Sequence, residues 1–110
     1  MKLPNGEHAV VDIQKLRDYC LNPHHLRGRH KARVFESALG MTDASAEILR
    51  EALLEAARTG NAAPGVKDEY GQRYIIDFPM HGLRGESQVR SVWIVLRRES
   101  FPHLVTCYVL

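Results

Sequence analysis

Cationic and imidazole side chains gather between Asn22 and Arg33, where the sequence NPHHLRGRHKAR holds three histidines and no carboxylate. A Pro and a Gly interrupt its first half and an apolar pattern follows, so we predict a loop that leads into a helix N-terminus. Such a terminus presents unpaired N–H groups and a partial positive charge, which favour an anion. The predicted chemistry is phosphate binding, with RNA as the first candidate ligand and with Arg27, Arg29 and Arg33 as phosphate contacts.

Lys31 and His30 are the candidate catalytic residues of this stretch. Lys31 lies four positions before Phe35, on the border of a predicted buried helix face, so its ammonium group can reach a ligand from an anchored stem. His30 is a candidate general base, because a neutral imidazole can accept a proton near pH 7. The alternative is a solvated basic loop in which the histidines are incidental.

A second pair of candidates lies in the last predicted strand. Thr106 and Tyr108 are two positions apart, so both point to the same polar face. Their hydroxyls can bond a phosphate oxygen, and the tyrosine ring can stack on a base. Ordinary strand propensity explains both residues equally well. Arg90, on a neighbouring predicted strand, is a further candidate, whereas Cys107 is predicted to be a core residue.

The sequence argues against a metal site. His24, His25 and His30 lie close together, but no second ligand pair accompanies them, and the two cysteines are isolated. Turn and surface positions account for the carboxylates of the strand region better than metal binding does. We therefore predict no metal and no cofactor.

Length and composition are those of one globular domain covering residues 1–110. Hydrophobic residues make up 45% and charged residues 25% of the chain, and the net charge is +2. No apolar run is long enough to cross a bilayer, and the N-terminus carries no signal-peptide pattern. We expect a cytoplasmic protein with reduced cysteines and no membrane association.

Apolar periodicity predicts helices followed by strands. Helices are expected at about 13–21, 29–39 and 43–59, and strands at about 63–69, 72–78, 88–97 and 103–110. Val34 and Ile48 are predicted among the buried helix residues, Pro79 is predicted to end a strand, and Val105 is predicted to face inward. This order indicates an α+β domain, with two or three N-terminal helices packed on one face of a three- or four-stranded antiparallel sheet.

Three motifs carry a resemblance to known proteins. They are KL..Y.LNP over residues 15–23, G..KA..F over residues 28–35 and LVT.Y over residues 104–108. With these motifs the chain resembles, over nearly its whole length, a bacterial family called a domain of unknown function. It is also similar to toxin domains of bacterial polymorphic toxins, which are placed in the superfamily of barnase, EndoU, colicin and RelE-type ribonucleases.

This resemblance implies N-terminal helices on a four-stranded antiparallel sheet, and it carries over Lys31, Thr106 and Tyr108 as site residues. His30 is less clearly part of the shared pattern, and Arg90 is carried over only by its strand position. The sequence lacks the long delivery region of such toxins, so we expect a standalone protein with a small antitoxin or immunity-type partner. A shared fold does not by itself establish an activity.

The resulting hypothesis is a toxin-like, metal-independent endoribonuclease that cleaves RNA by attack of the 2′-OH on phosphorus. Lys31, with Arg29 or Arg90, would stabilise charge on the phosphorane, and Tyr108 or Thr106 would orient the phosphate or help the leaving oxygen. His30 or a polarised hydroxyl would assist removal of the 2′-OH proton. The alternative is a non-catalytic module that binds RNA or a protein partner through the same basic side.

Overall fold

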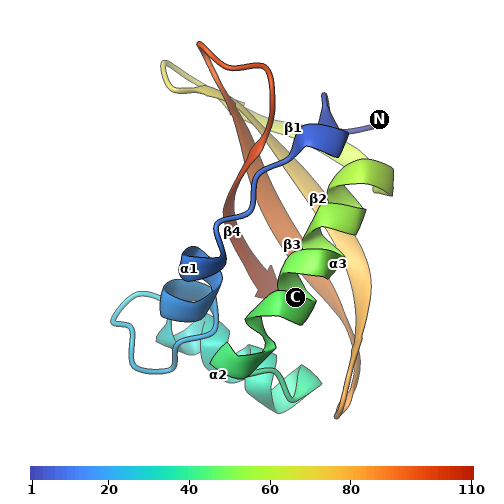
Figure 1. The fold of residues 1–110 in the computed structure, drawn as a ribbon. Coiled ribbons are helices and arrows are strands. Elements are labelled where there is room, and N and C mark those ends of the chain that lie inside the picture. Colours follow the sequence, from blue (N-terminus) through green and yellow to red (C-terminus); the bar gives the residue numbers. More distant parts are fainter.

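The computed structural model describes residues 1–110 as a layer of helices on one face of a four-stranded antiparallel sheet (Figure 1). This arrangement confirms the predicted α+β class. Helix α1 (Ile13–Lys15) continues into the π-helical turn η2 (Leu16–Cys20), and α2 (Arg29–Leu39) and α3 (Ala46–Thr59) follow, with 3₁₀ turns at Gly6–His8 and Asp43–Ser45. The strands are β1 (Ala62–Lys67), β2 (Gly71–Gly82), β3 (Gly85–Leu96) and β4 (His103–Val109), which neighbour one another in that order.

Strand β2 runs through Pro79, so the prediction that this proline ends the strand was wrong. Strand β1 pairs with β2 only as far as Ile76, and Pro79 lies beyond that point, opposite Gln88 of β3. Here β2 is an edge strand, where the missing N–H of proline leaves no partner unpaired. The β2–β3 hairpin therefore continues beyond β1 to Gly82 and Gly85.

The buried faces of the helices are narrower than the periodicity predicted. Val34 is 42% exposed and Ile48 is 65% exposed, although both were predicted to be buried. The helices form a single layer, so each contributes one stripe to the core, and Phe35 and Leu49 lie on those stripes. No helix is both long and apolar enough to span a membrane.

A β-bulge in β4 changes which of its side chains face the core, so part of the prediction for this strand was wrong. Val92 pairs with Thr106 and Trp93 pairs with Leu104, so Val105 is an extra residue between two ladder positions. Leu104 is consequently buried, whereas Val105, which was predicted to face inward, is only partly buried. Downstream of the bulge the alternation holds, so Cys107 enters the core and Thr106 and Tyr108 lie on the opposite face.

Trp93 anchors the core between sheet and helices. It is fully buried, and its indole Nε1–H donates a hydrogen bond to Ser91 Oγ at 2.9 Å. Ser91, which is also buried, donates in turn to the carbonyl oxygen of Ile76 at 2.8 Å. The Ser91 hydroxyl therefore gives both the indole N–H of Trp93 and the carbonyl oxygen of Ile76 a hydrogen-bond partner, as burial in an apolar core requires.

We predict that Ser91→Ala destabilises the protein by about 2 kcal/mol, because it leaves the indole N–H of Trp93 buried without an acceptor. The free energy of unfolding in urea, followed by circular dichroism, measures this effect. Ser87→Ala on the same strand is the matched control and should have little effect. The cost of Ser91→Ala should shrink when Trp93 is already phenylalanine; an undiminished cost would show that the hydrogen bond is not its origin.

Candidate functional site at the outer edge of β4

Lys31 reaches around the outer edge of β4 to the two hydroxyl residues of that strand. Its Nζ lies 3.4 Å from Thr106 Oγ1 and 5.2 Å from the centre of the Tyr108 ring. On the other side, the Tyr19 ring of η2 has its centre 5.5 Å from the same nitrogen. The structure therefore brings Lys31, Thr106 and Tyr108 together and adds Tyr19.

The Lys31 ammonium group has no carboxylate partner. Seven ion pairs occur in the structure, and none of them includes Lys31. The side chain is partly buried, and the two tyrosine rings provide cation–π attraction without neutralising the charge. An unpaired cation beside a hydroxyl is suited to bind an anion such as a phosphate group.

His25 holds the start of α2 against η2, a role that the sequence did not indicate. Its Nδ1 accepts hydrogen bonds from the backbone N–H groups of Arg27 and Gly28, both at 3.1 Å. Its ring packs edge-on to Tyr19, with the ring centres 4.8 Å apart. A side chain at Gly28 would meet the Tyr19 carbonyl oxygen at 2.2 Å, so only glycine allows this close approach. The loop thus sets the distance between Lys31 and Tyr19.

Arg90 lies directly opposite Tyr108 across the β3–β4 pair, on the same sheet face. Its guanidinium donates two hydrogen bonds to the Asp77 carboxylate, each 2.8 Å long. This pairing lowers the pKa of Asp77 and raises that of Arg90. Arg90 therefore lies at the margin of the site with its charge already compensated, unlike Lys31.

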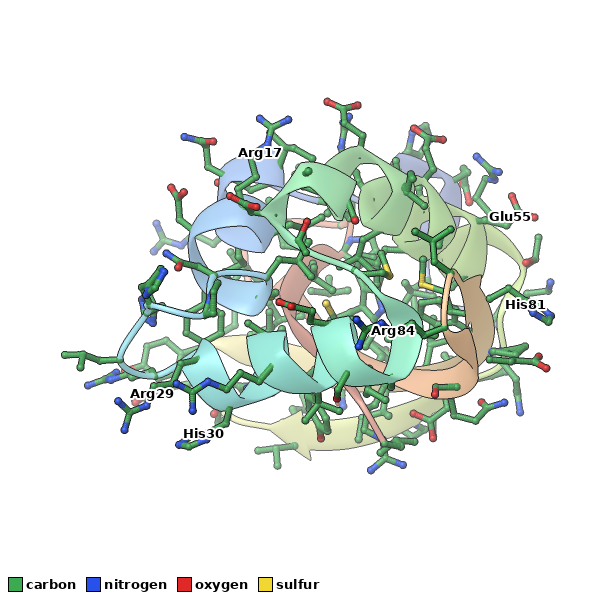
Figure 2. All side chains as sticks on the ribbon, turned by 90° about the horizontal axis from the view of Figure 1, so that it is seen from below. Arg17, Arg29, His30, Glu55, His81 and Arg84 are labelled. Atoms are coloured by element: carbon green, nitrogen blue, oxygen red, sulfur yellow. The ribbon has the colours of Figure 1, made fainter.

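The remaining predicted residues lie on the solvent side of the loop and of α2. Arg27, Arg29, His30 and Arg33 are all exposed. Figure 2 shows Arg29 and His30 projecting outward from the N-terminal end of α2. None of the four makes a hydrogen bond to Lys31, Thr106 or Tyr108 through its side chain. Their roles in phosphate contact and proton transfer stay predictions.

Cys20 and Cys107 form a buried thiol pair within the core. Both are free and fully buried, and they follow Tyr19 and Thr106 in the sequence. A hydrogen bond from Cys107, with help from its backbone N–H and from Lys15 and Lys31, lowers the pKa of Cys20 to about 7. The same hydrogen bond and burial raise the pKa of Cys107.

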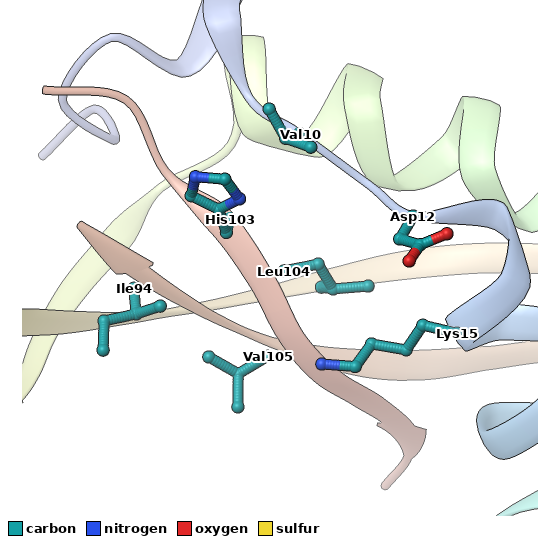
Figure 3. Close-up of a pocket in the computed structure, with 7 residues that line it drawn as sticks. All are labelled: Val10, Asp12, Lys15, Ile94, His103, Leu104 and Val105. Carbon is teal, nitrogen blue, oxygen red and sulfur yellow. The ribbon is translucent and has the colours of Figure 1, made fainter. Parts of the chain in front are cut away.

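A cavity of about 310 Å³ continues the site along the edge of β4 (Figure 3). Asp12, Lys15 and His103 contribute its polar groups, and Val10, Ile94, Leu104 and Val105 contribute its apolar walls. None of these three polar residues was predicted to be a site residue. Lys15 and Tyr19 share the KL..Y motif four positions apart, and that spacing is the signal that could have identified them.

Nowhere do three or more His, Cys, Asp or Glu side chains converge as a metal site would require.

We predict that Cys107→Ala raises the pKa of Cys20 from about 7 towards its ordinary value of 9.0, because the thiol donor is lost. Ultraviolet absorbance of the thiolate during a pH titration measures this. In the wild type, a pKa of Cys20 below its unfolded value means that stability increases as pH rises from about 7 to 9. That gain is lost as pH falls through 7. Titration of Cys20 near pH 7 in the variant would contradict the assignment.

The comparisons with known proteins place the chain in a family. No curated protein matches it. Its fold is similar to that of a chain in the structure described as "Contact-dependent growth inhibition toxin - immunity protein complex from Klebsiella pneumoniae 342". The TM-score is 0.70 at 22% identity, and the match covers 92% of this chain and 99% of that chain. At this identity the likeness concerns the fold alone. The family described as "Domain of unknown function (DUF6883)" matches residues 2–110, so the chain belongs to that family.

Proposed function

We propose that this domain is a toxin-like, metal-independent endoribonuclease whose site lies at the outer edge of β4. The observation that carries the proposal is the partly buried, unpaired ammonium group of Lys31 beside the Thr106 hydroxyl and between two tyrosine rings. A phosphate there would gain a cation that no carboxylate already neutralises. The flanking rings offer surfaces on which unpaired RNA bases can stack. The proposal places the reaction in the cytoplasm, where RNA is available.

In the proposed reaction the ribose 2′-OH attacks phosphorus and the bond from phosphorus to the 5′ oxygen breaks. The products are a 2′,3′-cyclic phosphate and a 5′-OH, so no water is consumed. Lys31 stabilises the charge on the phosphorane, and Thr106 and Tyr108 orient its oxygens. The hydroxyl of Tyr108 or Thr106 also helps the leaving 5′ oxygen by donating a proton to it. His30, or the Thr106 hydroxyl polarised by Lys31, assists removal of the 2′-OH proton. Arg90, which is paired with Asp77, lies opposite Tyr108 on β3.

A non-catalytic module that binds RNA is the second candidate function. The observation in its favour is that no imidazole or carboxylate contacts Lys31, so the group that would take the proton is not in place. Such a module would bind RNA with an affinity that falls steeply with salt and would release no product. Arg27, Arg29 and Arg33 would contribute phosphate contacts in either case.

An immunity-type or antitoxin protein is the proposed protein partner. Support comes from the structural neighbour, whose description names a complex of a toxin with an immunity protein. The exposed cations at the start of α2 would suit an acidic partner that covers the Lys31 site. Relief of growth inhibition by such a partner, on co-expression with this domain, would distinguish a toxin from a scaffold.

We predict that the purified protein cleaves RNA in EDTA and that Lys31→Ala lowers the rate about 10²- to 10³-fold, as loss of one transition-state donor does elsewhere. Gel analysis of RNA, with detection of the 2′,3′-cyclic end, measures cleavage. Lys67→Ala, at an exposed lysine of β1, is the matched control and should keep full activity. Absence of cleavage, or cleavage that persists in a His30→Ala, Lys31→Ala double variant, would refute the ribonuclease proposal.

A further inference from the structure

We propose that the cavity bounded by Asp12, Lys15 and His103 binds the nucleotide adjacent to the phosphate at Lys31, with preference for a base that carries an amino group. This inference deepens the proposed ribonuclease site and rests on it. The cavity volume of about 310 Å³ is at the lower end of the range for small-ligand sites, about 300 to 1,000 Å³. Its size suits a single nucleotide.

The two charged residues of the cavity are both available to a ligand. Asp12 and Lys15 line the same space, yet neither takes part in any ion pair, with each other or with another residue. Asp12 Oδ1 accepts a hydrogen bond from the backbone N–H of Gln14 at 3.0 Å, which leaves Oδ2 without a partner. A ligand with an anionic group for Lys15 and a hydrogen-bond donor for Asp12 would satisfy both.

A nucleotide whose base carries an amino group has both features. Its phosphate is anionic, and guanine presents a ring N–H next to an exocyclic amino group, two adjacent donors for a carboxylate. Adenine and cytosine present one amino group. Uracil presents a single ring N–H between two carbonyl oxygens, which a carboxylate repels. Guanine should therefore bind the Asp12 carboxylate most tightly, and uracil should bind it least tightly.

The apolar walls and His103 supply the surface for the base. Glu99 Oε2 lies 2.5 Å from His103 Nε2, and the Phe101 ring centre lies 5.2 Å from that of the imidazole. These contacts hold the His103 ring in one orientation at the rim. Figure 3 shows the His103 ring between Val10 on one side and Ile94 and Leu104 on the other. A preorganised histidine ring can stack on an unpaired base.

The cavity lies next to the Lys31 site along β4. Val105 of the cavity wall directly precedes Thr106, whose Oγ1 lies 3.4 Å from Lys31 Nζ. Lys15 lies one helical turn before Tyr19, whose ring centre is 5.5 Å from the same nitrogen, and neither lysine takes part in an ion pair. Neighbouring phosphates of one RNA strand would meet these two cations in turn.

The test is binding of guanosine and uridine 3′-monophosphates to the whole domain, followed by NMR amide shifts at low salt. We expect guanosine 3′-monophosphate to bind about tenfold more tightly, since a hydrogen bond to a charged group is worth that much. Asp12→Asn should bring the two affinities together while keeping the helix cap, because asparagine caps as well as aspartate. Lys15→Gln should weaken both nucleotides alike, and Lys67→Gln should change neither.

Asp12→Ser, which also retains a capping oxygen, should lose the preference in the same way and separates base recognition from helix stability. Equal affinities in the wild type, an unchanged ratio in both Asp12 variants, or shifts confined to residues away from the cavity would overturn the inference. The ribonuclease proposal fails separately. Selective binding without RNA cleavage would leave a nucleotide site in a binding module, and cleavage without selective binding would refute only this inference.

Discussion

The outer edge of β4 is the constraint on which the rest of the structure depends. An edge strand exposes unpaired backbone groups, and a protein must cover or satisfy them. Val10 does so at one end, donating to the Pro102 carbonyl at 2.9 Å and accepting from the Leu104 N–H at 3.0 Å. Further along, η2 packs against β4, with Cys20 and Cys107 both in the core. Covering this edge brings the N-terminal segment, η2 and the start of α2 to one strand.

The candidate site forms where η2 and the start of α2 cover the edge of β4. Tyr19 and Lys31 come from two segments that meet only because His25 and Gly28 hold the intervening loop against η2. Lys31 then has a short path around the strand edge to Thr106. The face of the sheet opposite the helices contributes the hydroxyl side chains, whereas Lys15 and Lys31 come from the helical side. A groove at an edge can combine both sides, whereas an open sheet face presents one.

Cationic side chains that already pair with a carboxylate are less able to bind an anion than those without a partner. Arg90 is bound to Asp77 through two hydrogen bonds, and Arg73 is bound to Asp68. Surface pairs of this kind contribute little stability but do occupy the guanidinium group. Lys15 and Lys31 have no such partner and are partly buried, so screening by water is weaker there. These two lysines, rather than the arginine-rich loop, therefore carry the proposed chemistry.

The sequence by itself determined the α+β class and the order of elements, because 3.6-residue and two-residue periodicities are local properties, and it singled out Lys31 as a candidate site residue. It also placed Thr106 and Tyr108 on one face of the last strand. Only the tertiary structure decided that these residues meet Lys31, since the contact spans 75 positions and passes around a strand edge. The same holds for the bulge at Val105 and for the cavity near Lys15. Both depend on which strand forms the edge and on what covers it, and no local pattern in the chain contains that information.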